Sequence, residues 1–350
     1  MYLAREFGFC YGVDRAVDYA YQTRRRFPER RVYLTGEIIH NPQVNHKIRA
    51  LGIGFLTDAA APLDQLGPSD VVILPAFGVT VAQLRDLESR GCTLVDTTCG
   101  SVLNVWKNVR RYCAGGFTSI IHGKYRHEET QATASQAAEY GGRYLVLLDR
   151  LETDLVCDYI RHGGDAEQFL SRFGTVASPG FDPDRDLQRV GLANQTTMLM
   201  SESLEMAELL KDAMRTRYGD DTLSDHYQAF DTICSATQDR QDAVARLLME
   251  RALDIMIVIG GYNSSNTCNL ARLCSETRPT FHIADPDCLV SADRIRHWPA
   301  GVGTSEVTTA AWFPATGDVT VGLTSGASTP DNLVGAAVLR LADLAGSART

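Results

Sequence analysis

Three cysteines, Cys10, Cys99 and Cys234, stand at the ends of short motifs that are spread over most of the chain. The motifs read FGFCYGVDRA, DTTC and DTIC, and the last two share the pattern D-T-x-C. No closely spaced C-x-x-C pair accompanies them. Three soft thiolates from remote loops would hold a metal and leave one of its positions open, which is where metal-based chemistry takes place. The first hypothesis is therefore a three-thiolate metal centre.

The alternative is that these cysteines are structural, because a free cysteine often behaves as a small buried apolar residue. We prefer that interpretation for the other six, which are Cys92, Cys113, Cys157, Cys268, Cys274 and Cys288. The number of cysteines is odd and no secretory segment is recognised, so we expect a reducing cytoplasm and no disulfide framework.

Composition narrows the class of protein. A chain of 350 residues is long enough for two or three domains. Its formal charge of −9 argues against a general nucleic-acid binder, although a few local donors could still capture a small anion. No apolar run of the length of a membrane span is present, so we expect no membrane association.

Short apolar runs alternate with amphipathic stretches, which is typical of βα units and parallel sheets. The expected strands are residues 31–34, 71–74, 93–95, 118–121, 144–148, 189–193, 254–259 and 319–323. Unusual polar motifs follow nearly all of them, namely GEIIHN, PAFGV, DTTC, HGKYRHEET, NQTT, GYNSSNT and TSGASTPD. One such motif alone could be a helix N-cap. Repetition at the carboxyl ends of strands, where open α/β sheets bind ligands, favours one shared site.

The strands fall into three groups, which predicts an α/β fold of three similar small lobes with mainly parallel sheets. We expect a first lobe over 11–98, a second over 99–230, and a third over 231–331 that the N-terminal residues 1–10 join. Residues 162–185 are expected to form a long, partly irregular connection inside the second lobe. Residues 332–350 are expected to form a C-terminal helix and tail.

The ordered set of motifs, from Phe7 to Asp331, resembles the LytB/IspH family of 4-hydroxy-3-methylbut-2-enyl diphosphate reductases. The resemblance implies a trefoil of three lobes around an oxygen-sensitive 4Fe-4S cluster held by Cys10, Cys99 and Cys234. Its fourth iron would have no protein ligand and would bind the allylic hydroxyl of the substrate. Oxidative loss of that iron would leave a 3Fe-4S form.

The implied reaction is the last step of the methylerythritol phosphate route to isoprenoids. The allylic diphosphate is dehydroxylated with two electrons and two protons, giving isopentenyl and dimethylallyl diphosphate plus water. The implied electron donor is a ferredoxin or a flavodoxin. Two rival hypotheses remain: a hydro-lyase with a similar open cluster, which would need no external electrons, and a non-catalytic iron–sulfur sensor, which would not require an acid at the site.

The resemblance also implies residue roles. Glu129 would deliver a proton, Thr196 would orient the hydroxyl and a proton relay, and His127 would assist in catalysis and binding. Its neighbour Glu128 is assigned to the start of a helix, where the macrodipole favours an acid. The diphosphate would be bound without Lys or Arg, by hydroxyls, amides and backbone N–H groups at helix starts. The implied diphosphate ligands are Ser264, Ser265, Asn266 and Ser328, with help from His40 and His127.

Two residues depart from the common family pattern. Many members have a histidine where this chain has Phe77, which cannot donate a hydrogen bond. The form PAFGV is similar to the plant and cyanobacterial branch, and Lys124 is a candidate for the replacement contact, with an exposed turn lysine as the alternative. Gly100 stands where many members have proline after the cysteine, which affects the rigidity of the loop and not ligation.

Overall fold

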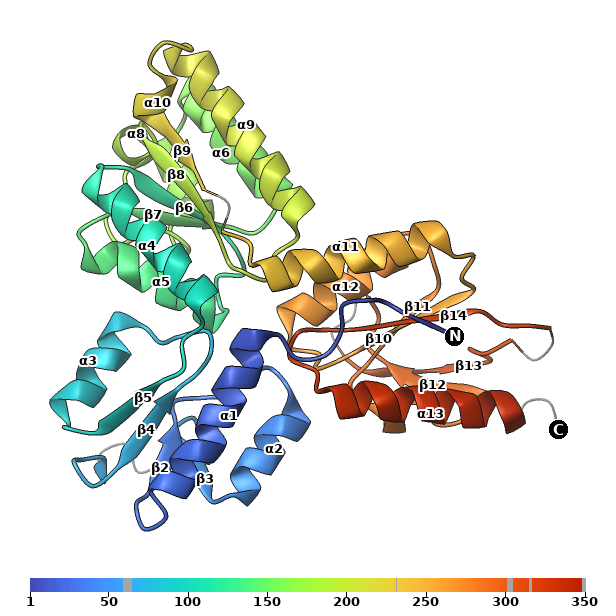
Figure 1. Ribbon diagram of the computed structural model, residues 1–350. Helices are drawn as coiled ribbons and strands as arrows, with labels where there is room; N and C mark the ends of the chain where they lie inside the picture. Colours follow the sequence, from blue (N-terminus) through green and yellow to red (C-terminus); the bar gives the residue numbers. More distant parts are fainter. Residues whose placement is uncertain (59–64, 231, 301–304, 315–316, 348–350) are drawn as a thin grey trace. The chain divides into compact units, whose positions relative to one another are not determined.

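The computed structural model describes residues 1–58, 65–230, 232–300, 305–314 and 317–347 (Figure 1). In this part of the chain three four-stranded sheets form, each of them all-parallel, together with one antiparallel hairpin. Helices make most of the connections between consecutive parallel strands, as is usual for such crossovers. The expected α/β class with mainly parallel sheets is confirmed.

The first sheet has the strand order β3-β2-β4-β5. Its strands are β2 (Val32–Leu34), β3 (Ile53–Phe55), β4 (Val71–Leu74) and β5 (Thr93–Asp96). Every residue of the inner strand β4 is buried, which explains why its sequence VVIL is apolar throughout. Helix α3 (Val81–Ser89) follows β4 and begins with a capping box at Thr80.

The second sheet has the order β7-β6-β8-β9. Its strands are β6 (Thr118–His122), β7 (Tyr144–Leu147), β8 (Val190–Asn194) and β9 (Tyr227–Ala229). Its helices are α4 (Gly100–Ala114), α5 (Glu128–Glu139), α6 (Arg150–His162), α7 (Ala166–Phe173), α8 (Pro183–Asp186), α9 (Met200–Tyr218) and α10 (Leu223–His226).

The connection over 162–185 is more regular than expected. It contains α7 and the start of α8, and its phenylalanines Phe169, Phe173 and Phe181 are buried in the core of the second sheet. The expectation underestimated this segment because a helix of eight residues gives only two turns of periodic pattern.

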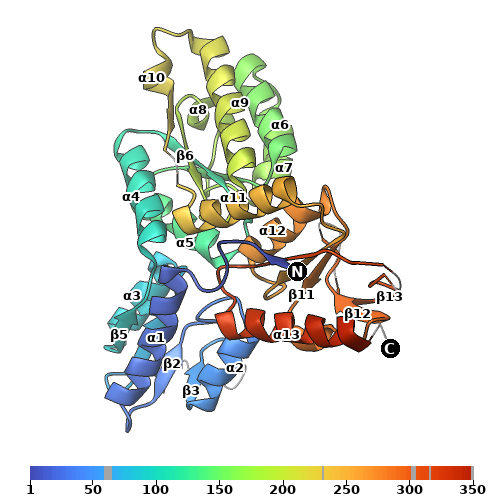
Figure 2. The same ribbon diagram turned by 45° about the vertical axis from the view of Figure 1, so that its right-hand side comes forward.

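The third sheet has the order β1-β14-β10-β11. Its strands are β1 (Tyr2–Leu3), β10 (Ile255–Ile259), β11 (Thr280–Ile283) and β14 (Val321–Ser325), and the hairpin is β12 (Arg294–His297) with β13 (Val307–Ala310). The remaining helices are α1 (Tyr11–Arg26), α2 (Pro42–Ala50), α11 (Ser235–Glu250), α12 (Ser265–Ser275), the 3₁₀ helix η2 (Pro286–Cys288) and α13 (Asp331–Ser347). Helix α13 packs along this sheet (Figure 2), and β1 joins it as expected.

The chain divides into two compact units. One contains Met1–Tyr21, Glu37–Gly52 and Ser235–Thr350, and the other contains Gln22–Gly36 and Ile53–Cys234. The first two sheets thus belong to one unit and the third sheet to the other. Each expected lobe contains one sheet, while the lobe boundaries stay predictions. Asp231, where one boundary was placed, and 348–350 of the tail lie outside the described residues. None of the described helices is long and apolar enough to span a membrane.

Candidate functional site

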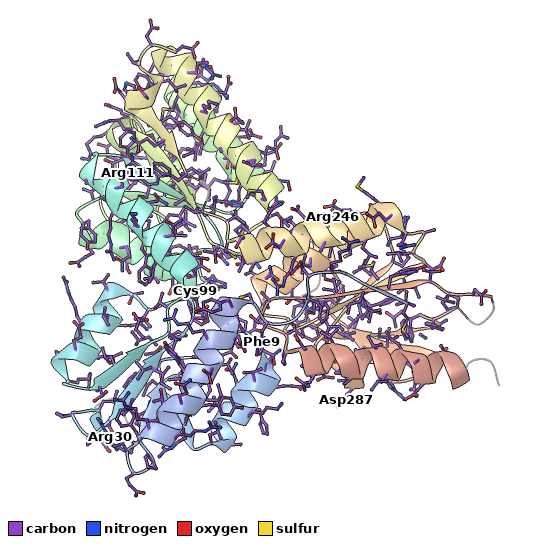
Figure 3. The ribbon with its side chains drawn as sticks, viewed as in Figure 1. Phe9, Arg30, Cys99, Arg111, Arg246 and Asp287 are labelled. Carbon is purple, nitrogen blue, oxygen red and sulfur yellow. The ribbon has the colours of Figure 1, made fainter. Side chains whose placement is uncertain are left out.

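The three cysteines occupy equivalent positions in the three sheets. Cys10 lies between β1 and α1, Cys99 between β5 and α4, and Cys234 between β9 and α11. In each case the preceding strand is an edge strand and the helix begins at the next residue. Figure 3 marks Cys99 at the start of α4. The thiolate is the form of cysteine that binds metals.

The backbone N–H of each cysteine donates to a carbonyl of the loop that follows the neighbouring inner strand. Cys99 donates to Ala76 at 2.8 Å, Cys234 to Thr196 at 3.3 Å, and Cys10 to Ala327 at 3.2 Å. Each acceptor lies two residues after the last residue of its strand: β4, β8 and β14 end at Leu74, Asn194 and Ser325. The three loops therefore share one backbone arrangement.

A second hydrogen bond joins the residue two places before each cysteine to the last residue of the same inner strand. The Thr97 hydroxyl donates to the Leu74 carbonyl at 2.6 Å. The Asn194 N–H donates to the Thr232 hydroxyl at 2.7 Å. The threonine of D-T-x-C thus fixes each cysteine loop to its sheet, a role that the shared pattern signalled and the expectations did not assign.

In the third sheet glycine replaces that threonine. The N–H of Gly8 donates to the Ser325 hydroxyl at 2.9 Å. Gly8 has φ +77°, and a Cβ there would lie 1.7 Å from Oδ1 of Asp331, so no side chain fits. In the third sheet the hydroxyl therefore comes from Ser325 at the end of β14, whereas in the other two sheets it comes from the threonine of the cysteine loop.

The nine cysteines are all free, and their burial differs. Cys10, Cys99 and Cys234 are half-buried, and Cys99 makes no side-chain cap bond to α4. Burial raises the pKa of Cys157 and of Cys274 to about 12 and also raises that of Cys288, in line with the apolar interpretation of these thiols. Cys92, Cys113 and Cys268 are half-buried as well.

Glu129, in the first turn of α5, is the buried acid of the second sheet's loops. The residue is 2% exposed. Its Oε1 accepts from the Thr196 N–H at 2.6 Å, and its Oε2 accepts from the Thr196 hydroxyl at 3.0 Å. The Thr196 carbonyl accepts from the backbone N–H of Cys234, so Thr196 makes hydrogen bonds both to the expected acid and to the backbone of the cysteine loop.

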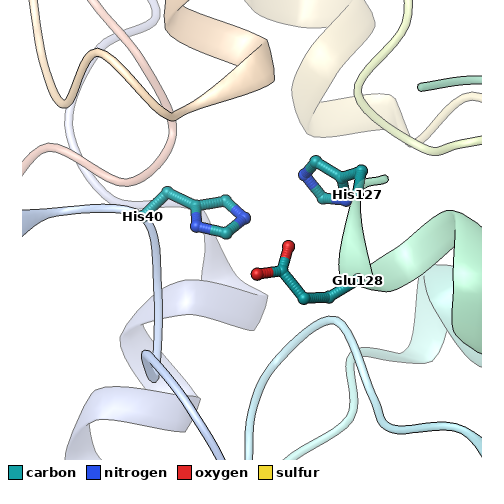
Figure 4. A group of neighbouring side chains, drawn as sticks. All are labelled: His40, His127 and Glu128. Atoms are coloured by element: carbon teal, nitrogen blue, oxygen red, sulfur yellow. The ribbon is translucent and has the colours of Figure 1, made fainter. Parts of the chain in front are cut away.

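His127 is the N-cap of α5. Its Nδ1 accepts from the Glu129 N–H at 3.2 Å, so Nε2 is the other ring nitrogen that a ligand could approach. Glu128 follows it and is exposed, as its assignment to a helix start requires (Figure 4). The Phe77 ring lies edge-on to the His127 ring with centroids 6.2 Å apart. Phe77 therefore packs where the common pattern has an ionisable side chain.

Gln195 holds the loop after β8 against the loop after β6. Its Oε1 accepts from the Lys124 N–H at 3.0 Å and from the Thr130 hydroxyl at 3.2 Å. A Cβ at Gly123 would lie 2.8 Å from the Thr130 hydroxyl, so this close approach requires glycine. The Lys124 side chain is exposed, and only its backbone takes part in this contact.

Four expected diphosphate ligands gather in the loops of the third sheet. Ser264 caps α12, accepting from the Thr267 N–H at 3.4 Å. Asn266 accepts through Oδ1 from the Ala327 N–H at 2.9 Å, which brings this loop to the one containing Ser328. Ser265 is 2% exposed, and its hydroxyl has no hydrogen-bond partner in the described chain.

Asn266 and Glu129 are also equivalent. Each is the second residue of the helix that follows an inner strand, α12 after β10 and α5 after β6. Each accepts from the N–H located two residues beyond the adjacent strand, that of Ala327 or of Thr196. The backbone N–H at this position is therefore bound by the neutral amide of Asn266 in the third sheet and by the carboxyl group of Glu129 in the second sheet.

His40 precedes α2 and belongs to the same unit as the serine loop. Its Nδ1 lies 3.2 Å from Oε2 of Glu37, and Nδ2 of Asn263 donates to that same oxygen at 2.8 Å. A Cβ at Gly261 would be 2.5 Å from the His40 carbonyl oxygen, so glycine permits the two loops to touch. Figure 4 shows His40 on its loop.

Fold and site together define a class: α/β proteins whose three parallel sheets each present one cysteine at a helix start. The family model described as LytB protein matches residues 1–342, and the chain belongs to this family. The family predicted from the motifs is confirmed.

Known relatives agree in name. The 4-hydroxy-3-methylbut-2-enyl diphosphate reductase of Gloeobacter violaceus is 51% identical, over 98% of this chain and 82% of that protein. The enzyme of the same name from a Synechococcus strain is 48% identical, over 98% and 85%. Both organisms are cyanobacteria, as the expected branch requires. A solved structure of (E)-4-hydroxy-3-methyl-but-2-enyl diphosphate reductase, described as the terminal enzyme of the non-mevalonate pathway, is 26% identical with a TM-score of 0.59, covering 98% of this chain and 99% of that one.

Proposed function

We propose that this protein is an oxidoreductase that converts 4-hydroxy-3-methylbut-2-enyl diphosphate into isopentenyl and dimethylallyl diphosphate plus water, as the terminal step of the methylerythritol phosphate pathway. Family membership and the relatives' names support the activity. The structural observation that carries it is the equivalence of the three cysteine loops, each fixed to its sheet by the same backbone bond.

The donor set fits an iron–sulfur cluster. Cys10, Cys99 and Cys234 would hold a 4Fe-4S cluster, each sheet contributing one thiolate from the loop after its edge strand. None of the three is in a disulfide, all three are half-buried, and each stands at the positive end of a helix, which offsets negative charge on sulfur. When bound, the cluster would pass on the two electrons taken one at a time from the external donor, and it would offer an open iron as a Lewis acid for the hydroxyl.

The protein's own part is proton delivery and orientation. Reductive loss of the hydroxyl as water requires one proton at the leaving oxygen and one at carbon. Glu129 would deliver a proton, because Thr196 holds both carboxyl oxygens in a water-poor position. The Thr196 hydroxyl would relay that proton and orient the substrate's oxygen, and His127 would assist through Nε2, the ring nitrogen that does not bind the Glu129 N–H.

The diphosphate would be bound by the loops of the third sheet. The Ser265 hydroxyl is buried and has no partner in the described chain, so an anionic oxygen could satisfy it. Ser264, Asn266 and Ser328 would add polar groups and the N–H donors of the α12 start. His40 would contribute a ring beside this loop.

The electron donor would be a ferredoxin or a flavodoxin. A cytoplasmic location fits nine free cysteines, because thiols persist in a reducing compartment.

The test is made on protein purified and reconstituted without oxygen. We expect it to be brown, to contain iron, and to reduce the allylic diphosphate when reduced methyl viologen is supplied. Colourless, iron-free protein after reconstitution would contradict the proposal. Turnover that continues without any donor would indicate a dehydration instead.

A further inference from the structure

The three helices that begin after the cysteines differ in charge. In α1, Asp14 and Asp18 are exposed within the first two turns. In α11, Asp239 is exposed and Asp242 is half-buried. The three helices occupy equivalent positions after their cysteines, so they differ in the charged side chains that follow each thiol.

Helix α4 has no acidic residue anywhere along its length, in a chain whose net charge is −9. Its three charged residues, Lys107, Arg110 and Arg111, are all basic and exposed. Helix α11 also has no acid in its first turn, so α4 differs from both α1 and α11 in having no acid at any position.

The outward face of α4 is fixed by packing on its other side. Val102, Val105, Trp106, Val109 and Tyr112 are buried, which is the spacing of one helical face. The outward face, which we call the α4 face, consists of Leu103, Asn104, Lys107 and Arg111. Leu103 is 45% exposed.

The α4 face starts at the thiol. At about 1.5 Å of rise per residue, Leu103 lies about 6 Å and Lys107 about 12 Å along the axis from Cys99. An exposed leucine with basic residues beyond it resembles the apolar centre and charged rim of a small transient interface.

We propose that the α4 face is the docking surface for a small acidic protein that carries one electron at a time. This inference rests on the proposed function, which requires two electrons per turnover. Two reduced carriers would dock in succession, each being oxidised by one electron that passes to the centre at Cys99. An acidic carrier would be attracted by Lys107 and Arg111, and the aspartates at the starts of α1 and α11 would repel it.

Lys107 is the residue to change. Arg110 donates to Oε1 of Gln136 at 2.9 Å, and Arg111 lies 4.8 Å from the Phe230 ring centroid, so changing either would disturb packing. The matched control is Arg246, an exposed cation on α11 (Figure 3). Both Lys107→Glu and Arg246→Glu reverse one surface charge.

The experiment compares two donors on anaerobic, reconstituted enzyme. With reduced plant-type 2Fe-2S ferredoxin, the KM for ferredoxin of Lys107→Glu should rise on the order of tenfold at low salt, and the difference should shrink as salt is added. With reduced methyl viologen, which needs no docking surface, Lys107→Glu should equal the unmodified enzyme. Arg246→Glu should resemble the unmodified enzyme with both donors.

The docking surface would be overturned if the KM for ferredoxin were unchanged in Lys107→Glu, or if it rose equally in Arg246→Glu. In either case, turnover driven by methyl viologen would leave the proposed function standing. Absence of viologen-driven turnover in the unmodified enzyme would overturn the proposed function itself. Leu103→Ser tests the apolar centre: it should weaken ferredoxin binding in a titration by a factor that does not depend on salt.

Discussion

The Thr196 backbone N–H donates to Oε1 of Glu129 at 2.6 Å, and the Thr196 hydroxyl donates to Oε2 of the same carboxyl group at 3.0 Å. One residue therefore fixes both oxygens of the buried acid. The Thr196 carbonyl also accepts from the N–H of Cys234, so the backbone of Thr196 links the carboxyl group to the cysteine loop.

Replacing Glu129 with glutamine separates proton delivery from structure. The amide oxygen can still accept from the Thr196 N–H, and the amide group can donate to the Thr196 hydroxyl oxygen, so the fold should survive. The amide cannot deliver a proton, and turnover should fall by roughly 10²–10⁴. Steady-state rates and iron content, measured on the same sample, check this expectation.

The matched control is Glu128→Gln, which removes the neighbouring exposed acid. It should change turnover by less than about threefold, because Glu128 is exposed and is assigned to the start of α5, where a carboxylate contributes about 0.3–1 kcal/mol to stability. If both variants lost activity equally, the assignment of the acid to Glu129 would be wrong.

The three equivalent cysteines should be individually essential for the cluster. Cys10→Ser, Cys99→Ser and Cys234→Ser each remove one soft ligand, so iron content and visible absorbance should be lost after anaerobic reconstitution. Cys113→Ser and Cys274→Ser are the controls, and both should keep the cluster, because Cys113 lies in the last turn of α4, at the opposite end from Cys99, and Cys274 is buried in another hydrophobic cluster. Full activity in any of the first three variants would refute the ligand set.

Much of this fold follows from the sequence because inner parallel strands are buried on both faces and stand out as apolar runs. The expected strand 71–74 has the observed bounds of β4, and the other seven expected strands each overlap an observed one. The strands that were not expected are β3, β9 and β11 at sheet edges and the β12–β13 hairpin. Their short, mixed sequences, such as YQA in β9, give no apolar run to detect.

The site follows from the sequence only in part. The carboxyl-end position of the polar motifs could be predicted, because strand ends are visible as changes of composition. The bonds that anchor the cysteine loops could not, because Gly8 and Ser325 are 317 residues apart and meet only through the register of β1 with β14. The same holds for Thr232 and Asn194, whose pairing depends on β8 and β9 being neighbours.

The two D-T-x-C threonines should differ in importance. In Thr232→Val the buried N–H of Asn194 loses the acceptor it uses, which costs about 1–3 kcal/mol. In Thr97→Val the Leu74 carbonyl still accepts from the Thr97 N–H, so the cost should be about 1 kcal/mol or less. Urea unfolding of the two variants gives the comparison, and an equal or reversed order would contradict the roles assigned to these hydroxyls.

Proline should be tolerated at Gly100, the departure noted after Cys99. Gly100 is the first residue of α4, where proline is favoured, and a Cβ there would meet nothing within 4 Å. Cys99 already has φ −67° and ψ 142°, the conformation that a following proline imposes. Gly100→Pro should therefore raise the free energy of unfolding by about 0.4–1 kcal/mol with unchanged iron content. By contrast, Gly78→Ala should destabilise the protein, since Gly78 has φ +79° and a Cβ would lie 2.6 Å from the Trp106 ring.

His282 should make stability depend on pH. Burial lowers the pKa of His282 from 6.5 to about 4. The Gly260 carbonyl, which accepts from Nε2 at 2.9 Å, raises the pKa by a smaller amount. The unfolded chain takes up this proton as the pH falls through 6.5, while the folded chain resists until about 4. The contribution of neutral His282 to the free energy of unfolding is therefore complete above pH 6.5 and decreases between pH 6.5 and about pH 4. Below about pH 4 it is lost, which amounts to a decrease on the order of 3 kcal/mol.

Urea unfolding at about pH 7 and at about pH 4.5 measures that loss for the unmodified protein and for His282→Asn, whose amide can still donate to Gly260. The variant should be less stable at the higher pH and should show a smaller decrease between the two. His162→Asn, at an exposed histidine beside Asp158, is the control. An unaltered decrease in His282→Asn would assign the acid sensitivity to other groups, of which His297, whose pKa burial also lowers, is the next to test.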